Sequence, residues 1–314
     1  MRALGVDTSN YTTSAALYAA EDGSLRNCGR PLFVQSGERG LRQSDAVFLH
    51  TKNLPEVFAE LFDSGVKPDA VGVSYAPREV PGSYMPCFLS GVAAASAVAL
   101  ANGLPLFRFS HQAGHVAAAA FSAGRFELLN GEFFAWHLSG GTSEMLFCRA
   151  DREKIVSCRR IGGSSDISAG QAVDRIGVRL GLSFPAGKEL DGLALGYGEK
   201  VKPARLSVKG TEMSLSGLEN KAGDLIASGA DGGYVAKFVL STIAESVKAV
   251  SKAALAEYGK FPILFSGGVS SSKLLRSLLA EELGAVFGTP ALSADNAAGI
   301  AVLTAMKAGN EKKI

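Results

Sequence analysis

Two segments of the sequence, one opening each half, share a pattern of apolar run, short polar turn and second apolar run. The first covers residues 3–18 and turns at Asp7-Thr8-Ser9, and the second covers residues 132–149 and turns at Ser139-Gly140-Gly141-Thr142-Ser143. Short apolar runs bounded by turn residues are typical of buried β-strands, so each segment predicts two strands joined by a turn. Each is followed by alternating helical and strand patterns, which predicts an α/β protein. The repeated plan favours two related domains that hold a nucleotide in a cleft.

The length and charge balance fit an ordinary globular protein of two domains. The chain has 314 residues, of which 47% are apolar and 20% charged. Its net charge of +2 is too small for a generally basic surface, so any RNA contact requires a local patch or a partner protein. The four cysteines are scattered without a CxxC pair, which predicts reduced thiols and a cytoplasmic location.

Residues 81–107 contain no charged side chain, but they predict a buried helix rather than a membrane span. Prolines, glycines and many alanines make this stretch too broken and too weakly hydrophobic to cross a bilayer. The N-terminus lacks the long apolar core of a signal peptide. We therefore expect no association with a membrane.

The segment Ser110-His111-Gln112-Ala113-Gly114-His115 holds two of the four histidines. In a helix, residues four apart lie on one face, close enough for both imidazoles to share a divalent metal. The alternative is that His111 and His115 only cap or line a buried helix. Gln112 occupies the position where a zinc protease needs a glutamate as general base, so peptide cleavage is not favoured.

Three turns rich in Gly, Ser and Thr are candidate phosphate-binding sites: Asp7-Thr8-Ser9, Ser139 to Ser143 and Ser266-Gly267-Gly268-Val269-Ser270. Such turns expose several backbone N–H groups together. Each turn alone is weak support, because most glycine-rich turns are only turns. Their order along the chain is the order expected for a nucleotide fold of two domains.

Seven short motifs in order resemble the family of the tRNA threonylcarbamoyladenosine transferase, called TsaD in bacteria. The similarity runs from about residue 2 to residue 305. The motifs are Gly5-Val6-Asp7-Thr8-Ser9, Ser110-His111-(x)3-His115, Ser139-Gly140-Gly141, Ala169-Gly170-Gln171-Ala172-Val173-Asp174, Ser214-Leu215-Ser216-Gly217-Leu218, Ser266-Gly267-Gly268-Val269-Ser270 and Asp295-Asn296-Ala297-Ala298-Gly299-Ile300-Ala301.

The resemblance implies an α/β fold of the actin, sugar-kinase and Hsp70 type (ribonuclease H-like), with a cleft between two domains. The first domain is expected to comprise residues 1–107 with the C-terminal helix 296–314, and the second residues 108–295. The implied activity is transfer of a threonylcarbamoyl group from its adenylate to N6 of adenosine 37 of tRNA. The chain would then be an acyltransferase.

The resemblance also implies the site residues. One divalent metal, iron or zinc, would be bound between the domains by His111, His115 and Asp295. In archaeal and eukaryotic members a metal-binding Tyr lies two residues before the Ser-Gly turn. Here that residue is His137, which we expect to be a third imidazole ligand; the alternative is a hydrogen bond to a backbone carbonyl in the core. Candidate catalytic residues are Asp7 and Ser9. The residues expected to bind an adenine nucleotide or acyl-adenylate are His137, Leu138, Ser139, Gly140, Gly141, Asp174, Gly187, Asp191 and Ser272.

Departures from the family pattern keep other functions open. Tyr11 and Thr12 replace two acidic residues of the first turn, Thr142 replaces a histidine, and Ser272 replaces an asparagine. The chain is therefore interpreted as a divergent paralogue. One alternative is a nucleotide- and metal-binding scaffold or regulator, and another is a carbamoyl-type transferase that acts on a small molecule.

The expected partners follow from the same resemblance. They are tRNA and the other proteins of the pathway, TsaB-like and TsaE-like. A hetero- or homodimer through the N-terminal domain is also expected.

Overall fold

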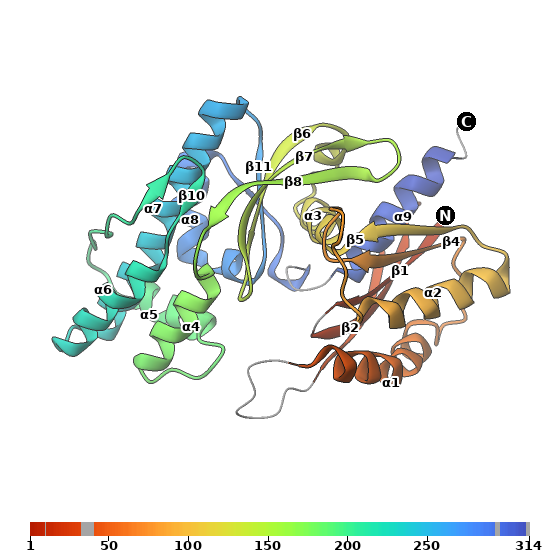
Figure 1. The fold of residues 1–314 in the computed structure, drawn as a ribbon, viewed down its shortest axis with the longest axis horizontal. Helices are drawn as coiled ribbons and strands as arrows, with labels where there is room; N and C mark the ends of the chain where they lie inside the picture. The colour runs from red at the N-terminus through yellow and green to blue at the C-terminus, as the bar shows by residue number, and fades with distance from the viewer. Residues whose placement is uncertain (10, 33–40, 293–295, 312–314) are drawn as a thin grey trace. The chain divides into compact units, whose positions relative to one another are not determined.

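A computed structural model describes residues 1–9, 11–32, 41–292 and 296–311, and in it the chain divides into two α/β units. The first unit comprises residues 1–131, 149–158 and 294–314, and the second comprises residues 132–148 and 159–293. The predicted fold class is confirmed. Figure 1 shows the elements of each unit.

The first unit is built on a five-stranded sheet of order β3-β2-β1-β4-β5. The predicted hairpin is present as antiparallel β1 and β2, and β1 also pairs in parallel with β4. A third antiparallel strand, β3, follows the hairpin. The bounds are β1 Arg2–Ser9, β2 Thr12–Ala19, β3 Leu25–Pro31, β4 Ala70–Ala76 and β5 Leu106–Ser110.

Helices cover both faces of this sheet because its strands are apolar on both sides. Leu4 and Val6 of β1 pack with helices α1 (Gln43–Leu61) and α2 (Phe88–Asn102). The residue between them, Gly5, faces α9 (Ala297–Glu311) on the opposite side, since alternate residues of a strand point to opposite faces. Helix α2 is the helix predicted within residues 81–107. Among the described residues, no helix is both long and apolar enough to span a membrane.

The histidine helix α3 (His111–Ser122) belongs to the first unit, whereas the sequence analysis placed it in the second domain. The reason is its close packing on α9. A Cβ atom on Gly299 would overlap the carbonyl oxygen of Gly114 and lie 2.8 Å from the backbone nitrogen of Ala118. The absence of a side chain at Gly299 therefore lets the two helix backbones touch. The short 3-10 helix η1 (Phe126–Asn130) then completes this unit.

The second unit is built on a seven-stranded sheet of order β12-β11-β6-β7-β8-β10-β9. Strands β6 and β7 are the second predicted hairpin. The bounds are β6 Glu132–Leu138, β7 Ser143–Asp151, β8 Ile155–Ser164, β9 Val208–Lys209, β10 Glu212–Met213, β11 Ile263–Ser266 and β12 Val286–Phe287. The outer ends of β7 and β8, residues 149–158, fall in the first unit, which the sequence analysis did not anticipate.

The core of the second unit forms around the long helix α7 (Gly232–Tyr258). The indole nitrogen of buried Trp136 donates to Ser251 Oγ at 2.9 Å, so the single tryptophan joins β6 to α7. The other helices are α4 Ala169–Arg179, α5 Gly187–Gly196, α6 Ser216–Ala227 and α8 Lys273–Leu283, with 3-10 turns η2 Gly268–Ser271 and η3 Pro290–Leu292.

The contact of α3 with α9 leads to a stability prediction. Gly299→Ala should lower the free energy of unfolding of the first unit by about 1–3 kcal/mol, because the added methyl group overpacks two helix backbones. Gly192→Ala is the matched control: it also adds a methyl group to a helical glycine, but its Cβ meets no atom within 4 Å. The control should be neutral or stabilising by about 0.5–1 kcal/mol. Urea unfolding of both variants checks the prediction, and equal stability of the two would contradict it.

Candidate functional site

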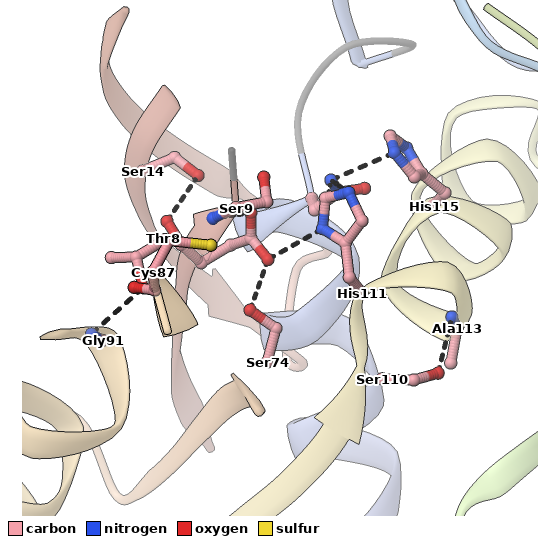
Figure 2. Close-up of polar contacts among 12 residues, drawn as sticks. Thr8, Ser9, Ser14, Ser74, Cys87, Gly91, Ser110, His111, Ala113 and His115 are labelled. Atoms are coloured by element: carbon pink, nitrogen blue, oxygen red, sulfur yellow. Dashed lines mark hydrogen bonds and ion pairs between the residues drawn. The ribbon is translucent and has the colours of Figure 1, made fainter. Parts of the chain in front are cut away.

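His111 and His115 lie together at the start of α3, as their spacing predicts (Figure 2). The helix begins after Ser110, whose hydroxyl accepts a hydrogen bond from the Ala113 backbone N–H at 3.1 Å. This is an N-cap, and it fixes the first turn that carries His111. The ring centroids of the two histidines are 4.6 Å apart. The two imidazoles are therefore close enough to act on one ligand.

Asp7, at the end of β1, orients the first histidine. Its Oδ1 lies 3.0 Å from His111 Nδ1, and Ser74 on β4 donates its hydroxyl hydrogen to the same oxygen. Burial alone would raise the pKa of Asp7, but the charge and hydrogen bond of His111, with the hydroxyls of Ser74 and Ser9, hold it below its usual value. An ionised carboxylate can only accept, so His111 Nδ1 is the donor in this contact. A carboxylate behind a histidine in this way is typical of metal sites.

Thr8 fixes the position of this strand end. Its hydroxyl donates to the Cys87 carbonyl and accepts from the Gly91 N–H, both at 3.0 Å (Figure 2). The start of α2 is thereby joined to the residue next to Asp7. In the polar turn that was predicted to bind phosphate, the hydroxyl of Thr8 thus has a structural role.

Asn296, directly before α9, brings the two histidines to one point. Its Nδ2 lies 2.8 Å from the Nδ1 and 3.1 Å from the Nε2 of His111, and 3.1 Å from the Nε2 of His115. Its Oδ1 is buried and has no hydrogen-bond partner in the described part of the chain. The sequence analysis quoted Asn296 within a motif but did not assign it a role. Its position next to the proposed ligand Asp295 was the available signal.

These residues fit a divalent metal. The Nε2 atoms of both imidazoles lie 3.1 Å from one point, the amide nitrogen of Asn296, while the amide oxygen has no partner and a carboxylate supports one imidazole. The third predicted ligand, Asp295, lies outside the described residues. Within ranges 1–9, 11–32, 41–292 and 296–311, no group of three His, Cys, Asp or Glu side chains is gathered.

A pocket of about 290 Å³ opens in front of the two histidines. Tyr11 and Thr12, which replace the acidic residues of the family pattern, both line it, and the Tyr11 side chain is 47% exposed. The backbone N–H of Ser9 is 3.2 Å from Asp7 Oδ2, so this candidate catalytic residue is also at the site. The lining residues are Ser9, Tyr11, Thr12, Pro77, Met85, Phe88, His111, His115 and Asn296. Met85 and Phe88 carried no signal in the sequence.

In the second unit, the predicted Ser-Gly-Gly turn follows β6 and is packed closely by two neighbours. A Cβ atom on Gly170 would lie 2.5 Å from the carbonyl oxygen of Ser139, and Ser168 Oγ donates to the Gly140 carbonyl at 2.7 Å. Gly267, with φ of 91°, lies against Leu138, and a side chain there would overlap the Leu138 carbonyl. The two glycine-rich turns of this unit are therefore adjacent, as a nucleotide site requires.

Asp191 and Ser272, predicted nucleotide contacts 81 residues apart, touch each other. Ser272 Oγ donates to Asp191 Oδ1 at 2.6 Å and caps α8 by accepting from the Leu275 N–H at 3.1 Å. Asp191 also accepts from the backbone N–H of Lys273 at 2.9 Å, so its carboxylate lies at the N-terminus of α8. This arrangement stabilises the helix start. Contact of either residue with a nucleotide stays a prediction.

Asp174 and Gly187 form a second such group. Asp174 Oδ1 accepts from the Ala186 N–H at 2.8 Å, directly before Gly187 begins α5. The motif residues Ser214 to Ser216 have a structural role instead. Burial would raise the pKa of Asp166, but hydrogen bonds from Ser214 Oγ and the Leu215 and Ser216 N–H groups hold it well below its usual value.

His137 lies at the end of β6 in the second unit, and its Nδ1 is 3.1 Å from Ser266 Oγ on β11. The imidazole is thus hydrogen-bonded to a hydroxyl, where the sequence analysis considered a backbone carbonyl. Its role as a metal ligand stays a prediction. The fourth histidine, His50, is fully buried beside Thr13 Oγ1 at 2.8 Å, and burial lowers its pKa.

Solved structures with the same fold identify the class of protein. T. kodakarensis HypF aligns with 98% of this chain over 48% of its own, at a TM-score of 0.62 and 13% identity. Xylulose kinase from Rhodospirillum rubrum aligns with 99% of this chain over 91% of its own, at a TM-score of 0.59 and 12% identity. The chain therefore has an actin/sugar-kinase-like fold.

Sequence comparison identifies the family. The profile of the tRNA N6-adenosine threonylcarbamoyltransferase family, TsaD, matches residues 37–302. The Streptococcus uberis enzyme of that name is 30% identical over 97% of this chain and 91% of its own length. The Methanocella arvoryzae enzyme is 28% identical over 92% and 84%. The chain belongs to the tRNA N6-adenosine threonylcarbamoyltransferase family, whose members are acyltransferases.

The histidine pair leads to a prediction about metal content. The purified protein should contain a divalent metal, and His111→Ala/His115→Ala should contain almost none, because both converging nitrogen ligands are lost. Elemental analysis after dialysis measures the occupancy, and a thermal unfolding transition verifies that the variant is folded. Stoichiometric metal in the double variant would contradict the assignment. His137→Gln separates the remaining alternatives: lower metal affinity supports a third imidazole ligand, and unchanged metal affinity supports a hydrogen-bonding role that includes the contact with Ser266.

The cap of α8 leads to a prediction about nucleotide affinity. Ser272→Asn restores the family's amide and keeps a good N-cap, so the helix should form normally. Affinity for an adenine nucleotide should rise by about 1–2 kcal/mol, the worth of one hydrogen bond. Ser277→Asn, at an exposed position of the same helix, is the control and should leave affinity unchanged. Calorimetry with AMP or the acyl-adenylate measures both, and Asp191→Ala should weaken binding. An unchanged affinity for Ser272→Asn would show that this residue does not contact the nucleotide.

Proposed function

We propose that this protein transfers the threonylcarbamoyl group of threonylcarbamoyl adenylate to N6 of adenosine 37 of tRNA. The observation that carries the proposal is the convergence of His111 and His115 beside the buried carboxylate Asp7, in a chain that belongs to this transferase family. The relatives named tRNA N6-adenosine threonylcarbamoyltransferase match most of this chain. The reaction breaks the bond from the carbamoyl carbon to the phosphate oxygen, so that AMP leaves, and forms a bond from the same carbon to N6 of the adenosine, which loses one proton.

The metal in this proposal is iron or zinc, held by His111, His115 and Asp295. When bound, it would act as a Lewis acid toward an oxygen of the acyl-adenylate. Asp7 keeps the hydrogen of His111 on Nδ1, which leaves Nε2 as the ligand atom. Asn296 supplies an amide oxygen or amide hydrogens at the same position, depending on the rotation of its side chain. Asp7 and Ser9 remain the candidate catalytic residues, since Ser9 lines the pocket and the buried carboxylate of Asp7 contacts His111, which also lines it.

The adenylate would bind on the second unit. The backbone N–H groups of the Ser139-Gly140-Gly141 turn suit its phosphate. A Cβ atom placed on Gly140 or Gly141 meets nothing within 4 Å, so a ligand can approach this backbone closely. The carboxylates of Asp174 and Asp191 suit ribose hydroxyls, and Ser272 lies beside Asp191.

The partners in this proposal are tRNA and TsaB-like and TsaE-like proteins. The first unit offers an apolar surface for an actin-like partner or a second copy of the chain. Phe48 on α1 is 68% exposed and Leu89 on α2 is 51% exposed. A hydrogen bond joins α1 to α2 next to these two side chains: Ser90 Oγ donates to the Val47 carbonyl at 3.2 Å. Such paired exposed side chains are typical of protein interfaces.

A second candidate function rests on the pocket lining. Tyr11 and Thr12 present a phenol and a hydroxyl where the family pattern has carboxylates, so the charge beside the reacting group is reduced. This favours a metal- and nucleotide-binding scaffold for another transferase, or a carbamoyl-type transferase with a small-molecule acceptor. The two candidate functions predict different nucleoside contents for the tRNA of a strain in which the gene for this protein is deleted.

The test is complementation of a strain that lacks its threonylcarbamoyl transferase. Expression of this protein should restore threonylcarbamoyladenosine in total tRNA, measured by nucleoside analysis. The His111→Ala/His115→Ala variant should not restore it, and Gly192→Ala should do so as fully as the wild type. The proposed transferase activity is overturned if the protein is expressed at normal levels, together with the partner proteins of the same organism, and no modified nucleoside is found. The scaffold and the small-molecule transferase would then be the candidate functions that are left.

A further inference from the structure

Residues 200–209 of the second unit form a basic ridge, a term used here for the exposed cations Lys200, Lys202, Arg205 and Lys209. The side chains between them, including Val201, Ala204, Leu206 and Val208, are half-buried and pack on the core of the unit. Every charged side chain of the segment therefore points outward, and every one is positive. The outward face also carries the Ser207 hydroxyl.

The ridge is held firmly on the unit at several points. The backbone N–H of Ala204 donates to Thr242 Oγ1 of α7 at 3.0 Å, and the carbonyl of Ser207 accepts from the Ser214 N–H at 3.0 Å. Lys209 lies in β9, which pairs with β10 (Figure 1). On the N-terminal side, Lys237 Nζ donates to the carbonyl of Glu199 at 2.9 Å. The cations are thus presented at fixed positions rather than on a free loop.

The positive charge of the ridge is not neutralised by neighbouring carboxylates. In the described part of the chain, no ion pair involves any of its four cations. Of the two acidic residues nearest in sequence, Glu212 lies opposite Lys209 in the β9–β10 pair but binds Arg160 through two contacts of 2.6 and 2.9 Å. Glu199 accepts from the uncharged Tyr197 hydroxyl at 3.2 Å, so it keeps its negative charge beside Lys200, and the four cations of the ridge outnumber it. Arg175 of the same unit, by contrast, is paired with Glu219. The ridge therefore attracts an external anion.

We propose that the basic ridge binds the phosphate backbone of the tRNA substrate. Lys and Arg side chains with a hydroxyl are the groups that contact phosphate oxygens, and they carry no base-specific information. A protein partner would be expected to need an exposed apolar or aromatic anchor, but the apolar side chains of this ridge face inward. The inference rests on the proposed function for the identity of the RNA. It explains how a chain with a net charge of only +2 holds a polyanion.

The experiment compares Lys202→Ala/Arg205→Ala with Lys67→Ala/Lys260→Ala in the full-length protein. The control pair removes the same charge from two exposed lysines outside the ridge. Affinity for an unmodified tRNA transcript is measured over a range of salt concentrations. The ridge variant should lose roughly tenfold or more in affinity at 100 mM salt, and the slope of log K against log salt should become shallower by about 1.5–2. The control variant should have the tRNA affinity and salt slope of the wild type. The ridge variant should bind AMP with the same affinity as the wild type.

The outcomes separate the ridge from the enzymatic activity. If the wild type and the ridge variant have the same affinity for tRNA and the same salt slope, the proposal that the ridge binds tRNA is overturned. This holds whether or not the wild type modifies tRNA. No tRNA binding by the wild type at low salt would overturn it as well. A loss confined to anionic lipid vesicles or an acidic protein, with tRNA binding intact, would also overturn it. Loss of tRNA binding in the ridge variant supports the ridge even where complementation fails, in which case only the proposed transferase is wrong.

Discussion

The contact of α3 with α9 is the constraint on which the first site depends. Gly299 meets the backbone of α3 at Gly114, and His111 and His115 lie on either side of that residue in the sequence. Asn296, one turn before Gly299, reaches both imidazoles, and Gly5 lets α9 lie against β1, the strand that carries Asp7. Small residues at these crossings therefore set the distances among a carboxylate, two imidazoles and an amide. A methyl group at any of these crossings would displace polar groups whose mutual distances must be kept to within fractions of an ångström.

The second unit positions its groups by a different means. Several of its candidate nucleotide residues lie at helix N-termini or strand ends, and the carboxylates of Asp174 and Asp191 reach helix N-termini from within α4 and α5. The first backbone N–H groups of a helix have no partner within the helix. Asp191 and Ser272 satisfy those of α8, Ser168 those of α4, and Asp166 those of α6. Each cap orders a turn that follows or precedes a strand of the sheet. The turns are consequently rigid before any ligand arrives, which lowers the entropic cost of binding.

Local sequence patterns predicted the helices and strands of this fold. They could not predict contacts between residues that are far apart in the sequence. The hairpins at residues 3–18 and 132–149 and the shared face of His111 and His115 follow from periodicity and spacing. The carboxylate of Asp7 meets Ser74 and His111 across 67 and 104 residues, and no local pattern specifies such a meeting. The domain boundary at residue 107 also differed from the structure, since the strand-to-helix pattern around Ser110 does not reveal that α3 packs on α9. The net charge hid the basic ridge because a sum over the chain cannot show where the charges lie.

The second unit is inserted within the first, and this order has a consequence for synthesis. Asn296 follows the whole of the second unit in the chain and meets His111 across 185 residues. The first site therefore cannot form until the ribosome has released the segment that holds Asn296 and α9. During translation the second unit can fold as soon as residue 293 has emerged, while the first sheet waits with one face uncovered. His111 and His115 are consequently kept apart from Asn296 until the whole of the second unit has been synthesised, and a metal ion captured earlier would be held by an unfinished site.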